Sequence, residues 1–265
     1  MLFAMSDIHG YFDLFCYRLE QLERDYSFFR SYSKDMLILL GDYIDEGPDS
    51  CKVLEKIKSL QDEFPEKVIA LKGNHDQWFL NYIFKRKSVP DADTNLITTS
   101  TFLVGAQAET LAAMAPGGRV NDPFEFYEWM RRRILKNYGE LIKWYEKLPC
   151  YYKTEHQIFV HAGIDEDAKD MWEWGTSEEI FLNKYPATQG SFYKDIIAGH
   201  VGTASISGNK SFHDIYWDGK SHYYIDGTAS FSKSIPVLAY DEEKGKYYSL
   251  HSDGLRPISR CAKQE

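Results

Sequence analysis

The sequence has no long hydrophobic run, and the apolar stretch at its beginning is too short for a membrane anchor or an export signal. Met1–Met5 has neither a basic flank nor an extended apolar core, whereas a membrane-spanning helix needs about 20 apolar residues. We therefore expect a first strand that already belongs to the fold, no membrane partner and a cytoplasmic location. A chain of 265 residues is expected to form a single domain over residues 1–265.

Cysteine is scarce, and positive charge is in deficit. The four cysteines include no Cys-x-x-Cys pair, so we interpret them as unpaired structural thiols in a reducing compartment. A formal net charge of −9 argues against a broad surface for the phosphates of nucleic acid. Internal repeats and low-complexity segments are also absent from the sequence.

Five short apolar runs are each followed within three residues by Asp, His or Asn. The runs are Met1–Met5 before Asp7 and His9, Met36–Leu40 before Asp42 and Asp45, Val68–Leu71 before Asn74 and His75, Ile158–Val160 before His161, and Ile196–Ala198 before His200. Helical apolar spacing follows the first two runs, and this alternation is typical of an α/β fold with parallel strands. Ligands of such folds lie beyond the carboxyl ends of the strands, so the polar residues are expected to form one site.

Helical patterns separated by loops fill residues 77–152, which we interpret as a cap inserted beside the site. Its helices are expected at Trp78–Ile83, Ala106–Met114 and Phe124–Lys147, and its loops at Asp91–Thr101 and Ala115–Pro123. Beyond His200, short runs bounded by turn signals predict a second, antiparallel sheet. Its strands are expected at Phe212–Trp217, His222–Ile225, Val237–Tyr240 and Tyr247–Leu250, and Arg256–Glu265 is expected to be a loose tail.

The strand-end residues have the chemistry of a metal site. Carboxylate, imidazole and amide groups without thiolate suit divalent ions such as Mn, Fe, Zn or Ni. The six candidate ligands are too many for one ion, and a carboxylate can bridge two: Asp7, His9, Asp42, Asn74, His161 and His200. Two-metal sites stabilise both the attacking and the leaving oxygen of a phosphoryl displacement, and they turn a bound water into a hydroxide nucleophile near neutral pH. Taken singly, each residue also has a structural interpretation, such as a core histidine for His161.

In their order these motifs resemble a known family. Asp7-x-His9-Gly10, Gly41-Asp42-x-x-Asp45, Gly73-Asn74-His75-Asp76, His161-Ala162-Gly163 and Gly199-His200 are similar to the motifs of the calcineurin-like metallophosphoesterases. The similar branch is that of the serine/threonine phosphoprotein phosphatases, which also holds bacterial phosphatases and diadenosine polyphosphate hydrolases. The resemblance runs from Asp7 to about Gly227, with Ile225-Asp226-Gly227 as a further similar strand end. It implies a four-layer α/β sandwich of two mixed β-sheets flanked by helices, with a helical cap insertion.

The resemblance also implies a role for each site residue. Two divalent metal ions, with manganese favoured, would be held by Asp7 and His9 on one side and by Asn74, His161 and His200 on the other, with Asp42 bridging. His75 would be the general acid that protonates the leaving oxygen. Asp45 would orient the His75 ring and keep it cationic, because a neighbouring carboxylate raises the pKa of an imidazole.

Two phosphate-binding arginines of the family pattern are missing. Glu46 occupies the position of the first, and no Arg occurs between His161 and Arg256. Three explanations are open. The substrate is less charged, as a diester is, or Arg131–Arg133 of the cap reach into the site instead. In the third, the metals remain but activity on monoesters is lost. A solvated helix face is the favoured interpretation of Arg131–Arg133. Trp172 and Trp174 could stack a nucleobase, although packing is the commoner role of such a pair.

We therefore expect a metal-dependent phosphoesterase. Phosphomonoester hydrolysis, on a phosphoprotein or a small molecule, ranks slightly above cleavage of a diester or a dinucleoside polyphosphate. The rival hypothesis is a metal-binding but inactive homologue that acts as a binding module. The expected partners are thus phosphorylated small molecules, nucleotides or phosphoproteins, and not bulk nucleic acid.

Overall fold

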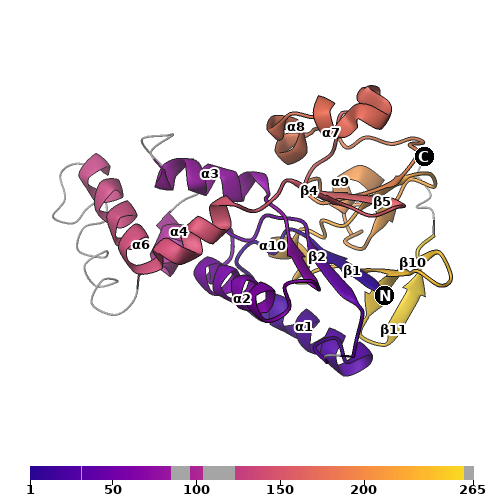
Figure 1. Cartoon of the computed structure of the whole chain (residues 1–265), viewed down its shortest axis with the longest axis horizontal. Coiled ribbons are helices and arrows are strands. Elements are labelled where there is room, and N and C mark those ends of the chain that lie inside the picture. Colours follow the sequence, from indigo (N-terminus) through magenta and orange to yellow (C-terminus); the bar gives the residue numbers. More distant parts are fainter. Residues whose placement is uncertain (31, 85–95, 104–122, 260–265) are drawn as a thin grey trace.

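Two mixed β-sheets form the centre of the chain in a computed structural model that describes residues 1–30, 32–84, 96–103 and 123–259 (Figure 1). The first sheet has the strand order β11-β10-β9-β1-β2-β3, and the second has the order β4-β5-β6-β8-β7. The strands of the first sheet are β1 (Leu2–Met5), β2 (Met36–Leu39), β3 (Val68–Ala70), β9 (Leu238–Asp241), β10 (Lys246–His251) and β11 (Gly254–Pro257). Those of the second are β4 (Tyr151–Lys153), β5 (Gln157–Val160), β6 (Asp195–Ala198), β7 (Tyr216–Trp217) and β8 (His222–Tyr224).

The parallel strands lie in the middle of each sheet. In the first sheet, β1, β2 and β3 are parallel, and β9, β10 and β11 extend the sheet antiparallel from the other edge of β1. In the second sheet, β5, β6 and β8 are parallel, with antiparallel β4 and β7 at the edges. The strands that carry the predicted site residues are therefore all parallel ones.

Alternating side chains of β1 show why its whole run is apolar. Leu2 and Ala4 pack against residues of the second sheet, whereas Phe3 and Met5 pack beneath α1 (Phe12–Tyr26) and α2 (Ser50–Glu63). The strand is thus covered on both faces, so both sets of alternating positions must be hydrophobic. On the outer face of the second sheet lie α7 (Trp172–Gly175) and α8 (Glu178–Asn183). The result is the predicted four-layer order of helices, sheet, sheet and helices (Figure 1).

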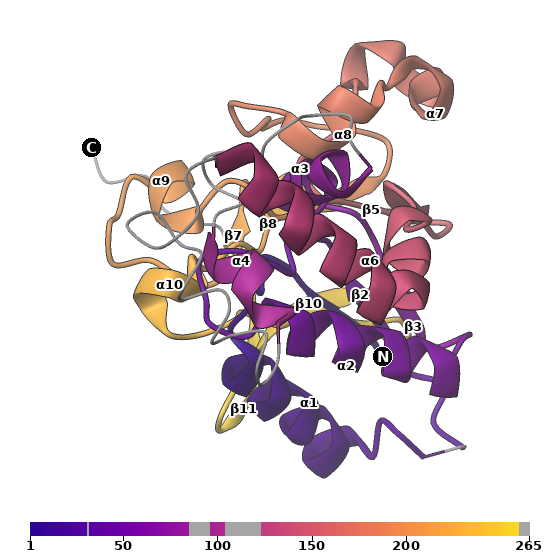
Figure 2. The same ribbon diagram turned by 90° about the vertical axis from the view of Figure 1, so that its left-hand side faces the viewer.

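The described part of the segment between β3 and β4 is mostly helical. Helices α3 (Asn74–Ile83), α4 (Leu96–Thr101) and α6 (Pro123–Glu146) lie together beside the sheets (Figures 1 and 2). The predicted helix at Trp78–Ile83 is confirmed, and the one at Phe124–Lys147 is confirmed apart from Lys147. The loop predicted for Asp91–Thr101 is wrong from Leu96 onward, because α4 is stabilised by packing against α2. Residues 91–95, Ala106–Met114 and 115–122 lie outside the described residues.

The prediction of a separate antiparallel sheet after His200 is wrong. β7 and β8 complete the sheet of β5 and β6, whereas β9 and β10 join the sheet of β1. The pairing of Leu2 with Tyr240 uses the edge of β1 that β2 leaves open. The predicted strand at Phe212–Trp217 is reduced to Tyr216–Trp217. The predicted tail begins in fact inside β11, which ends at Pro257, and residues 260–265 lie outside the described ones.

The remaining described helices are short: η1 (Glu166–Met171), α9 (Thr203–Ser207) and α10 (Ala229–Ser232). Among the helices that the structure describes, none is long and apolar enough to cross a membrane. Cys16, Cys51 and Cys150 carry free thiols, as predicted. Cys261 lies outside the described residues.

A buried histidine ties the second sheet to the segment before α7. His222 of β8 is 1% exposed, and its Nδ1–H donates to the carbonyl of Gly190 over 2.9 Å. Nε2 lies 3.4 Å from a Glu166 carboxylate oxygen, and Nδ1 lies 3.2 Å from Asp218. Burial disfavours the His222 cation, but the two carboxylates outweigh this effect and raise the pKa of His222. A pKa above the unfolded value of about 6.5 means that the cation stabilises the fold below that pH and loses this effect as pH rises.

We predict that His222→Gln lowers the free energy of unfolding by about 1–3 kcal/mol at pH 6, because a hydrogen-bonded buried cation is lost. The loss is expected to be smaller at pH 9, because the stabilisation by the cation falls as pH rises. Urea denaturation of both proteins at the two pH values measures the difference. Equal losses at pH 6 and pH 9 would contradict an electrostatic role for His222.

Candidate metal centre

The structure brings all eight predicted site residues to one end of the two sheets. Each follows the carboxyl end of a parallel strand: Asp7 and His9 follow β1, Asp42 and Asp45 follow β2, Asn74 and His75 follow β3 at the start of α3, His161 follows β5, and His200 follows β6. Six of the eight are buried, and His75 and His200 are partly exposed. The first sheet therefore supplies most of the site, and the second sheet supplies two histidines.

The loops that carry these residues have unusual backbone angles. The left-handed region of φ, which non-glycine residues rarely adopt, holds six residues of the loops: Asp7 (52°), His9 (46°), Asp42 (54°), Asp45 (73°), Glu46 (54°) and His200 (64°). Hydrogen bonds between loops stabilise this arrangement, since the N–H of Asp7 donates to the carbonyl of Gly41 over 3.1 Å and that of His9 to the carbonyl of Asp42 over 2.9 Å. Such strain persists only where the surroundings enforce it and clusters at functional sites.

Two glycines let neighbouring loops approach the carboxylates of Asp42 and Asp7 closely. A Cβ atom at Gly73 would overlap the side chain and the backbone N of Asp42, and one at Gly199 would overlap the side chains of Ser6 and Asp7. Only a residue without a side chain fits at either position.

Backbone carbonyls orient two of the imidazoles. The Nδ1–H of His9 donates to the carbonyl of Ile44 over 2.8 Å, and the Nδ1–H of His161 donates to that of Leu40 over 2.9 Å. These bonds leave Nε2 of each ring directed into the site, which is the arrangement that metal-binding histidines use. The bond from His161 to Leu40 also joins the second sheet to the first.

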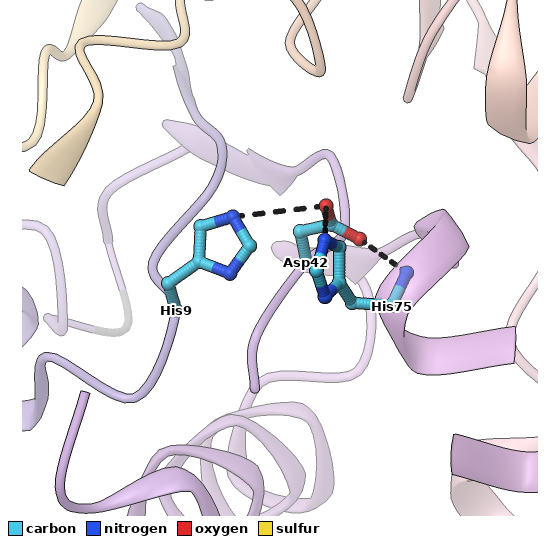
Figure 3. A group of neighbouring side chains, drawn as sticks. All are labelled: His9, Asp42 and His75. Carbon is cyan, nitrogen blue, oxygen red and sulfur yellow. Dashed lines mark hydrogen bonds and ion pairs between the residues drawn. The ribbon is translucent and has the colours of Figure 1, made fainter. Parts of the chain in front are cut away.

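The carboxylate of Asp42 lies at the centre of the site. Its Oδ2 is 3.4 Å from Nε2 of His161, 3.8 Å from Nε2 of His9 and 4.0 Å from Nε2 of His75. Figure 3 shows the contacts of His9 and His75 with this carboxylate, whose Oδ1 also accepts the backbone N–H of His75 over 3.0 Å. The positive charge of His161, His75 and His9 outweighs the effect of burial and lowers the pKa of Asp42.

Two groups of side chains that could each hold a metal ion share Asp42. One is His9, Asp42 and His75, and the other is Asp42, His161 and His200. Asn74 adjoins the second group, because its Oδ1 lies 2.8 Å from Nε2 of His161 and 3.0 Å from Nδ1 of His200. Burial and the charge of His161 lower the pKa of His200 to about 4, so its ring is the neutral form that binds metals.

The carboxylate of Asp7 already accepts a backbone hydrogen bond, which the predicted ligand set does not include. Its Oδ1 lies 3.9 Å from Nε2 of His9, but both carboxylate oxygens accept the backbone N–H of His200, over 3.3 and 3.1 Å. His75, rather than Asp7, completes the first group around Asp42.

His75 and Asp45 form a hydrogen-bonded pair. The Nδ1–H of His75 donates to Oδ2 of Asp45 over 2.7 Å. Burial disfavours the imidazolium, but the hydrogen bond that His75 donates to Asp45 and the charge of Asp42 outweigh it and raise the pKa of His75 to about 9. The ring of His75 also contacts that of Trp78, with 4.6 Å between their centroids.

Two buried aspartates support the site, although sequence reasoning gave them no role. Asp76 accepts the N–H groups of Asp42, Tyr43 and Gly73 over 2.9, 3.1 and 2.7 Å. Its place three residues after the N-cap glycine of α3 is a capping-box signal that could have indicated this role. Asp226, two residues beyond β8, is close enough to Asp7 that burial and the Asp7 charge raise the pKa of Asp226 to about 7.

The arginines of the cap have partners along the helices. Arg131 is 9% exposed, pairs with Glu128 at 2.6 Å and donates to the carbonyl of Ile83. Arg132 donates to the carbonyl of Glu128, and Arg133 stacks over Trp129. The structure therefore favours a helix-surface role for Arg131–Arg133 over a phosphate clamp, with Arg131 buried rather than solvated.

Trp172 and Trp174 do not act as a pair. Trp172 is fully buried among Tyr151 and Phe181, and its Nε1–H donates to the hydroxyl of Tyr193 over 3.0 Å. Trp174 is 86% exposed. The hypothesis that both rings stack on one nucleobase is therefore wrong.

Comparison with known proteins agrees with this geometry. The family model for the calcineurin-like phosphoesterases matches residues 2–230. A symmetrical bis(5'-nucleosyl)-tetraphosphatase of Vibrio parahaemolyticus is 28% identical over 177 residues, which are 67% of this chain and 48% of that protein. A protein with the same name from Glaesserella parasuis is 24% identical over 202 residues, or 76% of this chain and 57% of that one. The chain thus spans about half the length of these curated relatives.

A solved structure has the same fold. The cold-active protein-tyrosine phosphatase of a psychrophilic Shewanella species superposes with a TM-score of 0.59, with 97% of this chain and 80% of that chain covered. Its sequence identity is 14%, so the likeness shows the fold alone.

We predict that Tyr145→Phe destabilises the chain, because the hydroxyl of Tyr145 on α6 donates to the buried carboxylate of Asp76. Hydrogen bonds to charged groups contribute about 1.5–3 kcal/mol, and urea unfolding measures the loss. Tyr82→Phe is the matched control, since the Tyr82 hydroxyl donates to a neutral carbonyl, that of Tyr127, over 2.6 Å. Its loss is expected to be about 1 kcal/mol, and a larger loss than for Tyr145→Phe would contradict the prediction.

Proposed function

Because the chain belongs to the calcineurin-like phosphoesterase family, we propose that it hydrolyses phosphate esters with two divalent metal ions bound at the strand ends. The observation that carries this proposal is the position of Asp42, whose one carboxylate belongs to both groups of potential metal ligands. A carboxylate shared in this way is what a dinuclear centre requires.

The proposed ligands are Asp7 and His9 for one ion and Asn74, His161 and His200 for the other, with Asp42 between them. The donors fit divalent ions, because they are oxygens and imidazole nitrogens without a thiolate, and the fixed rings of His9 and His161 direct Nε2 into the site. Two such ions supply Lewis-acid charge stabilisation and an activated water. We propose manganese, with iron, zinc and nickel as the other candidates.

His75 is the proposed proton donor to the leaving oxygen. Its raised pKa of about 9 keeps the ring protonated at neutral pH. Asp45 holds Nδ1, so that Nε2 faces the side of the site where the Asp42 carboxylate lies. A proton delivered in this way contributes about 10²- to 10⁴-fold to hydrolysis of an ester with a basic leaving group.

Phosphomonoesters of small molecules or proteins are the first proposed substrates. A second candidate is a diester or a dinucleoside polyphosphate, and Glu46 favours it. Glu46 is exposed and follows Asp45 directly, and an anion at that position repels a doubly charged monoester more than a singly charged diester. The names of the two sequence relatives also support it. Trp78, whose ring contacts that of His75, also lines a groove of about 760 Å³.

We predict that chelation abolishes turnover and that divalent metal restores it. Asp42→Asn and His75→Asn are each expected to lower kcat by at least about 100-fold, because one removes the shared ligand and the other the proton donor. Turnover of phenyl phosphate, whose leaving group is basic, tests both, with metal content measured by elemental analysis. His156→Asn, at an exposed histidine on the β4–β5 turn, is the control for the substitution itself. Full turnover by either metal-loaded site variant would overturn the mechanism.

We further predict that Glu46→Arg raises kcat/KM for p-nitrophenyl phosphate by about tenfold or more, since a charge reversal near a dianion is worth roughly 1–4 kcal/mol. Glu46→Gln should give part of this gain. The matched substrate is bis(p-nitrophenyl) phosphate, for which the gain should be smaller. A wild-type preference for the diester would support the second candidate function. No turnover of either ester with two metals bound would support an inactive binding module instead.

A further inference from the structure

We propose that Thr98, on helix α4, is a positioning residue that fixes the Asp45–His75 pair for proton transfer. This inference rests on the proposed function, in which His75 protonates the leaving oxygen. Thr98 belongs to the segment 77–152 that we propose as a cap, so the cap would contribute to the chemistry as well as to the walls of the site.

Each oxygen of the Asp45 carboxylate has its own partner. Oδ2 accepts the Nδ1–H of His75 over 2.7 Å, and Oδ1 accepts the hydroxyl of Thr98. Asp45 is 1% exposed and Thr98 is fully buried, so bulk water does not reach this hydrogen bond. The hydroxyl therefore opposes rotation of the carboxylate away from His75.

Helix α4 is itself fixed against the amino end of α2. The hydroxyl oxygen of Thr101 accepts the backbone N–H of Cys51 over 3.1 Å. Asp49, the N-cap residue of α2, makes no capping hydrogen bond with its own side chain, so Thr101 serves this end of the helix instead. Phe102, just beyond α4, stacks on Phe79 of α3, with 5.3 Å between centroids and 17° between planes. Figure 2 shows α4 beside α6 and above α2. These contacts hold Thr98 in place over Asp45.

Ser50 completes the arrangement from α2. Its hydroxyl oxygen accepts the backbone N–H of Asp45 over 3.1 Å and lies 3.5 Å from the hydroxyl of Thr98. Asp45 thus has its main chain held by α2 and its side chain held by α4, although its φ of 73° is in the left-handed region. Removing the Thr98 hydroxyl would leave Oδ1 of Asp45 as a buried acceptor without that donor. The carboxylate would then rotate toward another hydrogen-bond donor.

The expected consequence depends on the leaving group. Protonation by His75 matters for a basic leaving group such as phenolate and little for p-nitrophenolate, which departs readily without a proton. We expect Thr98→Val, which keeps the shape and removes the hydroxyl, to lower kcat for phenyl phosphate about tenfold and kcat for p-nitrophenyl phosphate less than about twofold, with KM unchanged. Thr98→Ser should restore both to within about twofold.

The control is Ser100→Ala, which removes an exposed hydrogen bond of the same helix, from the Ser100 hydroxyl to the carbonyl of Ile97 over 2.6 Å, without touching Thr98 or Asp45. It is expected to leave the ratio of the two kcat values unchanged. In a double-mutant cycle, Thr98→Val should have no further effect on kcat once Asp45→Asn is present. If Thr98→Val does not fold, Thr98→Ala is compared on the same two esters. Equal losses on both esters, or no rescue by serine, would overturn the role of Thr98.

A second readout needs no turnover. The low-field proton resonance of the His75 Nδ1–H should shift in Thr98→Val and remain in place in Ser100→Ala. An unshifted resonance in Thr98→Val would overturn the inference whatever the kinetics show. If the wild-type protein binds two metals but lacks esterase activity, while the resonance still shifts in Thr98→Val, the proposed function is refuted and the contact between Thr98 and Asp45 stands.

Discussion

The site depends on one buried negative charge, the carboxylate of Asp42. A buried carboxylate is strongly disfavoured unless cations and hydrogen-bond donors surround it. Here those partners come from every side: His9 from the β1 loop, His75 from the start of α3, and His161 from the other sheet. The loops that supply them are held by hydrogen bonds to one another and by glycines where a side chain would collide with a carboxylate. The electrostatic requirement of one residue thus accounts for the approach of four chain segments.

Much of this arrangement is readable in the sequence. Runs such as Met1–Met5 are apolar at successive positions because both faces of the strand are buried, and the polar residue that follows each run marks the strand end. The pairing of the later strands is not readable in this way. β9 pairs with β1 because the edge at Leu2 is open, a fact about the assembled sheet that the local pattern of Val237–Tyr240 does not contain. Thr98 was missed for a similar reason, since the threonine-rich α4 has weak helix propensity and is stabilised by contacts with α2.

Charge gives the site its individual character. The overall surface is acidic, Glu46 stands beside the proposed proton donor pair, and Arg131 is bound to Glu128 on α6. The cations that the described residues direct at the site are therefore chiefly imidazoles, whose charge depends on whether metal ions or protons occupy them. Binding of an anionic substrate would in this chain depend on bound metal more than it does where guanidinium groups share that task.

The six left-handed residues of the site loops have a consequence for evolution in the laboratory. Each such conformation costs of the order of 1–3 kcal/mol, a substantial part of the roughly 5–15 kcal/mol that separates a typical folded domain from its unfolded state. Selection for heat resistance alone should therefore accumulate glycine or asparagine at these positions, beginning with the exposed Glu46. Selection for activity should resist the same changes at Asp42 and His200. The divergence between the two selections would map which residues are retained for chemistry at the expense of stability.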